Sequence, residues 1–184
     1  HRIHSKQPGE DLRNRETDIL ARMFATAEAP YAYLINLDTL PYREGNETWL
    51  TDVSDRMAAE PFAFFSTCGL RFMEDDRIDA RYLRTQRFSN NHALISIALW
   101  FEIMELYSQE SVAGDPVARF HSEWAIERWC QATQSFGLRR EASLDWRAFQ
   151  VQQCDDRLLA TRAKFQSGRG VKSFLGRVYR QEMH

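Results

Sequence analysis

Apolar residues occur along this chain in short runs separated by charged stretches, and the spacing within each run predicts its local structure. Residues 11–27 place leucine, isoleucine, methionine and phenylalanine at helical intervals, and Pro30 follows shortly afterwards. Residues 31–38 (YAYLINLD) form a run of strand length that ends on Asp38 and is followed by Pro41. We therefore expect a helix and then a buried strand that presents a carboxylate at its C-terminal end.

The same criteria assign elements to the rest of the chain. Residues 47–59 carry an apolar face and precede Pro61, which predicts a second helix. A third clear helix begins at Asp115 and Pro116, residue types that are typical of a helix start, and ends at Gly137. The other expected elements are a strand at 62–70, a strand and an amphipathic helix between 88 and 106, a short strand at 144–151, and a helix at 155–165.

Residues 73–87 are highly charged and interrupt this alternation. One interpretation is a solvated loop stabilised by ion pairs. The other is a basic flap that closes over an anionic ligand, because four arginines lie within the segment. The pattern leaves both open.

Helices and strands that alternate in this way predict an α/β domain in which helices flank a small mixed sheet. The length of 184 residues suits one such domain, spanning residues 1–184, with a basic, glycine-containing tail at 168–184. The chain begins with His1 and enters its first helix without an earlier strand. We therefore expect it to be an incomplete α/β domain, because nucleotide-binding strands usually come first in such folds.

Composition excludes several classes of protein. The net charge of −2 gives no electrostatic argument for binding nucleic acid. No apolar run reaches the roughly 18 to 20 residues of a membrane span, and no signal peptide is visible. The three cysteines are too few and too scattered for a disulfide framework or a CxxC metal site. These features predict a cytoplasmic protein without a transmembrane segment, and the basic tail leaves peripheral contact with a membrane surface open.

Polar side chains suited to ligand binding lie at two places in the N-terminal half. Asp38 ends a predicted strand, where a metal ion or a sugar hydroxyl could pair with its charge, or where it could simply cap the next turn. Ser89, Asn90 and Asn91 precede an apolar run and are either a helix cap or contacts for a hydroxylated ligand.

Glu123 and Glu127 are four residues apart in the third helix and so lie on one face. Glu123, next to Trp124, could act as a general base. In the alternative interpretation both carboxylates lie on a solvent face and Glu127 pairs with Arg128 or Arg119, and the spacing alone favours this alternative.

Histidine and cysteine chemistry is less specific. His92 and His121 could be bases or metal ligands, but a lone histidine is more often a polar side chain at a helix start. The apolar surroundings of Cys68 indicate a core position. The chain contains no P-loop, GxGxxG, GxSxG or HExxH motif.

Taken in order, these segments resemble the C-terminal two-thirds of a GT-A-fold glycosyltransferase, and most closely the inverting family 2 of nucleotide-sugar-dependent transferases. The run ending in Asp38 resembles the strand that ends in a DxD-type motif. FSNNHALISIALWFEI resembles the acceptor-side segment in which a polar turn precedes a strand and a helix. HSEWAIERW resembles the helix that bears the acidic catalytic base.

The resemblance implies a reaction between a nucleotide-diphosphate sugar and an acceptor hydroxyl. It gives Asp38 the metal or ribose role and makes Glu123 the base, with Glu127 as the nearest substitute. It places Ser89, Asn90 and Asn91 on the acceptor side, and it lets the tail from Arg169 to Arg177 close over the diphosphate. A divalent ion, Mn²⁺ or Mg²⁺, would stabilise the departing diphosphate.

Two departures separate the chain from that family. Leu40 stands where the second acid of DxD is expected, and leucine has no oxygen to give a hard cation. The strands that hold the nucleotide base are not in the chain. The alternative hypothesis is therefore a non-catalytic interaction or scaffold protein derived from a degenerate transferase domain, with Trp124 and Trp129 as interface anchors or simply as core residues.

Overall fold

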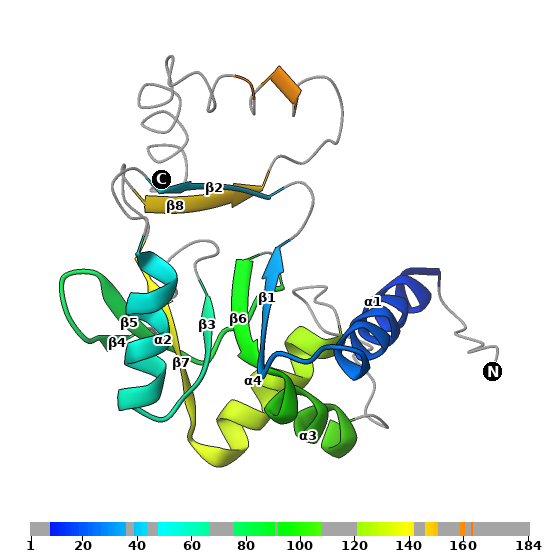
Figure 1. Ribbon diagram of the computed structural model, residues 1–184. Helices are drawn as coiled ribbons and strands as arrows, with labels where there is room; N and C mark the ends of the chain where they lie inside the picture. Colours follow the sequence, from blue (N-terminus) through cyan, green and yellow to red (C-terminus); the bar gives the residue numbers. More distant parts are fainter. Residues whose placement is uncertain are drawn as a thin grey trace.

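The computed structural model describes residues 8–35, 39–43, 48–66, 76–90, 92–107, 121–141, 146–150, 159–160 and 163. Within these ranges the chain forms a six-stranded sheet, a separate two-stranded sheet and four helices (Figure 1). The helices are α1 (Pro8–Ala25), α2 (Trp49–Ala59), α3 (Ile97–Tyr107) and α4 (His121–Thr133). The prediction of an α/β domain is confirmed.

The large sheet is mixed. Its strands, in spatial order, are β1 (Tyr31–Ile35), β6 (His92–Ser96), β3 (Phe62–Ser66), β7 (Phe136–Arg140), β5 (Tyr82–Thr85) and β4 (Asp76–Arg77). Only the β3–β7 pair is parallel, and all the other neighbours run antiparallel. In the small sheet β2 (Thr39–Arg43) pairs antiparallel with β8 (Trp146–Gln150).

Each face of the large sheet has its own hydrophobic core. In β6, Ala93 and Ile95 face one core and Leu94 faces the other, as the two-residue period of a strand requires. The first core is closed by α1, α3 and α4, and the second by α2 through Trp49 and Val53. Figure 1 shows α2 on the opposite side of the sheet from the other three helices.

The strand predicted at 31–38 corresponds to β1, which ends at Ile35, and residues 36–38 lie outside the described ranges. A second strand, β2, begins at Thr39. Pro41, expected to stop the strand, instead lies inside β2 opposite Ala148. Among the described residues β2 pairs with β8 alone, and prolines within sheets are found on such edge strands.

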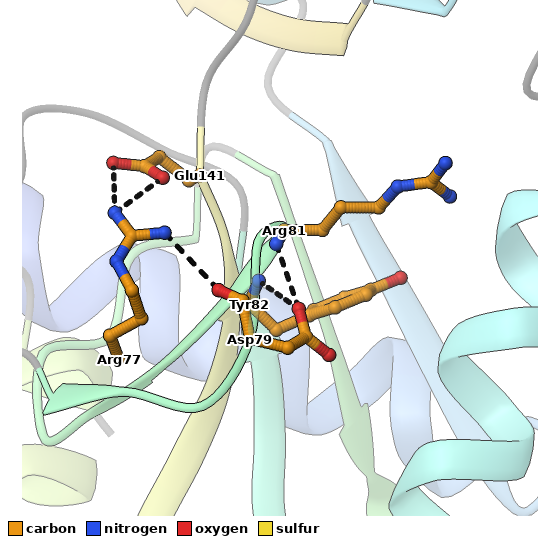
Figure 2. Close-up of polar contacts among 5 residues, drawn as sticks. All are labelled: Arg77, Asp79, Arg81, Tyr82 and Glu141. Atoms are coloured by element: carbon orange, nitrogen blue, oxygen red, sulfur yellow. Dashed lines mark hydrogen bonds and ion pairs between the residues drawn. The ribbon is translucent and has the colours of Figure 1, made fainter.

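The charged segment is not simply a loop. Its residues 76–77 and 82–85 form β4 and β5, and Tyr82, Leu83 and Thr85 are buried. The interpretation of residues 76–87 as a flap is therefore wrong, while the expected ion pairs are present. Figure 2 shows the guanidinium of Arg77 donating to both carboxylate oxygens of Glu141, at 2.9 and 2.8 Å.

The turn between β4 and β5 is held by one side chain. Asp79 Oδ1 accepts the backbone N–H groups of Arg81 and Tyr82 at 2.7 and 3.0 Å (Figure 2). Its other oxygen accepts from Arg56 of α2 at 2.7 Å. The hairpin is thus joined to both the sheet and a helix, which explains why so polar a segment is ordered in this way.

Gly137 does not end a helix, as the sequence analysis expected, but lies inside β7. The helix ends four residues earlier at Thr133, and Gln134 takes the left-handed conformation with φ 55°. The Ser135 N–H then donates to the Cys130 carbonyl at 3.0 Å, which is the outer hydrogen bond of a Schellman cap. Glycine is required at 137 for a different reason, because the Phe64 ring packs directly against its Cα.

Candidate functional site

The most polar part of the protein interior lies where α1, α4 and the β5–β6 connection meet. Four polar or acidic side chains with at most 7% of their surface exposed come from these elements: Asn90, Ser122, Glu123 and Glu127. Glu16 of α1 completes the group. We call these five residues the acidic cluster. Buried polar groups need partners, and here nearly all the partners are within the cluster or in the adjoining backbone.

Glu127 is compensated by the chain that follows β5. Its Oε2 accepts from Arg87 Nη1 at 3.1 Å, and its Oε1 accepts the backbone N–H of Phe88 at 3.2 Å. Its side chain is 3% exposed, whereas the Arg87 side chain is 31% exposed. The interpretation in which Glu127 lies on a solvent face is therefore wrong, and its ion pair is with Arg87, not with Arg128 of its own helix.

Glu123 is also buried, which again contradicts a solvent-facing position. Its Oε1 accepts the backbone N–H of Asn90 at 2.8 Å. This contact joins the acid of α4 to the polar turn before β6, two segments that are far apart in the sequence. Ser89, the other described residue of that turn, is half-buried.

Glu16 faces Glu123 across two bridging side chains. Asn90 Nδ2 donates to Glu16 Oε1 at 2.6 Å and to Ser122 Oγ at 2.8 Å, and the Ser122 hydroxyl donates to Glu16 Oε2 at 3.1 Å. Burial raises the pKa of Glu16 from 4.5 to about 7, and the negative charge of Glu123 also raises it, against the lowering effect of the hydrogen bonds from Ser122 and Asn90.

One acceptor in the cluster has no donor. Asn90 Oδ1 is buried and accepts no hydrogen bond from the described residues, although the Nδ2 of the same amide is used twice. A buried acceptor without a donor is unfavourable. The cluster is therefore short of hydrogen-bond donors.

The structure brings four of the residues expected from the sequence into one region: Ser89, Asn90, Glu123 and Glu127. Asp38, Asn91 and Arg169 lie outside the described residues, as does the 168–184 tail. Of Leu40 only the backbone is described, as a member of β2.

Sequence reasoning missed Glu16 and Arg87. Glu16 precedes the buried Leu20 and Phe24 by one and two helical turns, so an extension of the apolar stripe toward the start of α1 would have placed this acid in the interior. Arg87 was grouped with a solvated charged segment. Arg87 differs from the other arginines of that segment because its partner, Glu127, is buried.

The two described candidate histidines have structural partners. His92 is buried at the start of β6, where its Nε2 hydrogen-bonds with the Tyr33 hydroxyl and its ring stacks on Trp49. His121 Nε2 donates to the Tyr107 carbonyl oxygen at 3.1 Å, and its ring stacks on Trp124. These contacts fix both rings and support a structural role.

Metal and thiol chemistry find little support in the described part of the chain. It contains no group of three or more histidine, cysteine, aspartate or glutamate side chains that could hold a metal ion. Burial raises the pKa of the Cys130 thiol to about 12, so this thiol is not a nucleophile at neutral pH. Cys68 lies outside the described residues.

No helix within the described ranges is both long and apolar enough to cross a membrane. Comparison with known proteins gives no match: neither a protein-family model, nor a curated protein, nor a solved structure matches this chain. The function must therefore be inferred from the residues and their contacts.

Proposed function

We propose that this chain belongs to a GT-A-type glycosyltransferase that transfers a sugar from a nucleotide-diphosphate sugar to an acceptor hydroxyl with inversion. The observation that carries the proposal is the hydrogen bond from the Asn90 N–H to Glu123 Oε1. The resemblance assigns Asn90 to the acceptor side and Glu123 to the role of base. The two residues are 33 positions apart in the sequence and are in contact in the folded chain.

In the proposed reaction Glu123 is the general base. As the acceptor oxygen attacks the anomeric carbon, its O–H bond breaks and the proton passes to the carboxylate. The bond from the anomeric carbon to the diphosphate breaks with its electron pair leaving on the diphosphate oxygen. The backbone N–H of Asn90 orients the carboxylate, because it donates to Oε1 and so ties Glu123 to the acceptor turn.

The divalent ion that the resemblance implies is not assigned a step. Asp38 would be its ligand, but this residue lies outside the described ranges, and Leu40 provides no oxygen. The described residues also contain no other ligand group. The proposal therefore depends on the base and the acceptor turn alone.

The edge of the large sheet also supports this proposal. Strand β1 pairs only with β6, so among the described residues its other edge has no neighbour. Its outward side chains Tyr31, Tyr33 and Ile35 are 47%, 36% and 43% exposed. Further strands could extend the sheet at this edge, where a transferase of this type needs its nucleotide-binding strands.

The same edge favours a second candidate, a non-catalytic interaction protein. An uncharged strand edge with exposed aromatic side chains can bind a partner strand. The tryptophans proposed as anchors argue less for it, since Trp124 is half-buried and packs against Tyr107 and His121.

The test uses the chain together with any sequence that its gene encodes upstream. It measures release of nucleoside diphosphate from a panel of UDP- and GDP-sugars in the presence of Mn²⁺, with binding followed by thermal shift. We expect at least one sugar to raise the melting temperature and to be turned over, and Glu123→Gln to lower turnover by about 10² to 10⁴. Glu102→Gln, which changes an exposed acid of α3, is the matched control and should leave turnover unchanged. Binding of no donor, or full activity in Glu123→Gln, would overturn the proposal.

A further inference from the structure

We propose that Glu16 and Glu123 form one carboxyl pair that holds a single proton between them, bridged by Asn90 and Ser122. Glu16 is in this view a positioning residue: it carries the proton and so keeps Glu123 ionised. The inference deepens the proposed function and rests on it only for the use of the pair in catalysis, because the pair itself can be tested without a substrate.

The bridging contacts are what make the two acids a pair. Asn90 donates with its side chain to Glu16 at 2.6 Å and with its backbone to Glu123 at 2.8 Å. Ser122 donates to Glu16 at 3.1 Å and directly precedes Glu123 on α4. Asn90 thus binds both carboxyl groups and Ser122 binds that of Glu16, and the charge of Glu123 affects the pKa of Glu16.

The cations nearby do not neutralise Glu16. The hydrogen bonds of Glu16 come from Asn90 and Ser122, both neutral, and no lysine or arginine among the described residues contacts it. Arg87, the charged residue of the adjoining connection, is paired with Glu127 one turn further along α4. Burial and the negative charge of Glu123 therefore both act against ionisation of Glu16.

The remaining titratable groups around Glu16 have other partners. On α4, His121 donates to the Tyr107 carbonyl and Glu127 accepts from Arg87. On α1 itself, Arg15 and Asp18 are exposed to solvent. Besides burial, which has the largest effect, the proton on Glu16 is controlled by Ser122, Glu123 and Asn90.

An independent observation points to the same conclusion. Asn90 is 3% exposed, and its Oδ1, on the amide that bridges the pair, accepts no hydrogen bond from the described residues. The amide that donates to Glu16 through its nitrogen is thus left without a donor at its oxygen. A proton retained on Glu16 adds the donor that the cluster lacks.

Burial and the charge of Glu123 assign the proton to Glu16, and they outweigh the two hydrogen bonds that stabilise its charged form. Glu123 accepts a backbone N–H, which stabilises its charged form, while burial and the charge of Glu123 both disfavour ionised Glu16. With the proton on Glu16, the negative charge of the pair lies on Glu123, which is the base in the proposed reaction.

The experiment is an NMR titration of the ¹³C carboxyl signals of Glu16 and Glu123 in the intact chain. In the wild type we expect one of the two signals, that of Glu16, to titrate near pH 7. Glu123→Gln should lower this midpoint by about one pH unit because it removes the neighbouring charge. Glu16→Gln should abolish the transition near pH 7, because Glu16 is the group that holds the proton there.

Two further variants separate coupling from loss of structure. Ser122→Ala removes a donor to Glu16 and should raise its midpoint, the opposite direction to Glu123→Gln. Asp18→Asn changes an exposed acid of the same helix and should move neither signal. If both acids titrate below about pH 5.5 in the wild type, or if Glu123→Gln leaves the Glu16 midpoint unchanged, the pair does not exist. Failure to bind nucleotide sugars would overturn the transferase proposal and leave this titration intact.

Discussion

Arg87 Nη1 and Glu127 Oε2 lie 3.1 Å apart, and this ion pair joins the end of β5 to the middle of α4. The two partners differ in their surroundings, since the carboxylate is 3% exposed and the arginine 31%. Removal of the arginine would leave a buried negative charge, which costs far more than the loss of a surface pair.

We expect Arg87→Met to lower the free energy of unfolding by about 3 kcal/mol, measured by urea denaturation. Arg84→Met is the matched control: its partner Glu60 is 3.6 Å away and 44% exposed, and so the loss there should be less than about 1 kcal/mol. The double variant Arg87→Met, Glu127→Leu should recover much of the stability. Equal effects of the two single changes would contradict a buried pair.

The raised pKa of Glu16 predicts that the stability of the folded protein falls as the pH rises toward 7. Its pKa is 4.5 when the chain is unfolded and about 7 when it is folded, so between these values the folded protein binds more protons. The contribution of this group to stability is therefore fully present below pH 4.5 and is lost as the pH rises to about 7. The loss amounts to about 3 kcal/mol.

Unfolding in urea at pH 5, 6, 7 and 8 measures this contribution. Glu16→Gln should flatten the profile because its side chain no longer titrates. Asp18→Asn, on the exposed side of α1, should keep the wild-type profile. A profile that is the same in the Glu16→Gln variant and the wild type would show that this residue is not the titrating group.

Substitutions at Gly137 and Phe64 should have non-additive effects on stability, because the two residues are in direct contact. A Cβ atom at residue 137 would lie 2.1 Å from the Phe64 ring, so Gly137→Ala must displace a fully buried side chain. We expect a loss of about 1 to 3 kcal/mol in unfolding free energy. Addition of Phe64→Leu should cost less in the Gly137→Ala background than alone, and strictly additive effects would contradict the contact.

A substitution of Gln134 by glycine should stabilise the folded protein. It adopts φ 55° at the end of α4, a conformation that costs a side chain roughly 1 kcal/mol and glycine almost nothing. Gln134→Gly should therefore raise the melting temperature. Gln131→Gly, three residues earlier inside the helix, should lower it. Both substitutions remove a glutamine side chain. Opposite changes in melting temperature would therefore show that the backbone conformation at each position causes the effect.

The sequence allowed much of the secondary structure to be predicted. The apolar periodicities of 11–27, 47–59, 62–70 and 144–151 correspond to α1, α2, β3 and β8, with ends that differ by a few residues. These elements have a regular buried face, which is the signal that such patterns carry. Strand β5 was missed because the exposed Arg84 interrupts its short run of buried residues. Strand β4 consists of two exposed charged residues and so has no apolar pattern.

The site was less predictable than the fold. Spacing placed Glu123 and Glu127 on one helix face but could not tell whether that face was buried. The answer depends on Glu16 and Arg87, which come from α1 and from the β5–β6 connection. Contacts between distant segments decide the state of an acid, and a single sequence contains no direct record of them.

The parallel pairing of β3 with β7 has a consequence for how the chain folds. Phe62 and Phe136 are register partners, yet β4, β5, β6, α3 and α4 all lie between them in the sequence. A long loop must close before this ladder can form, and such closure slows folding. We therefore expect the β3–β7 pairing at the centre of the sheet to form last. The local β4–β5 hairpin and the helices should form before it.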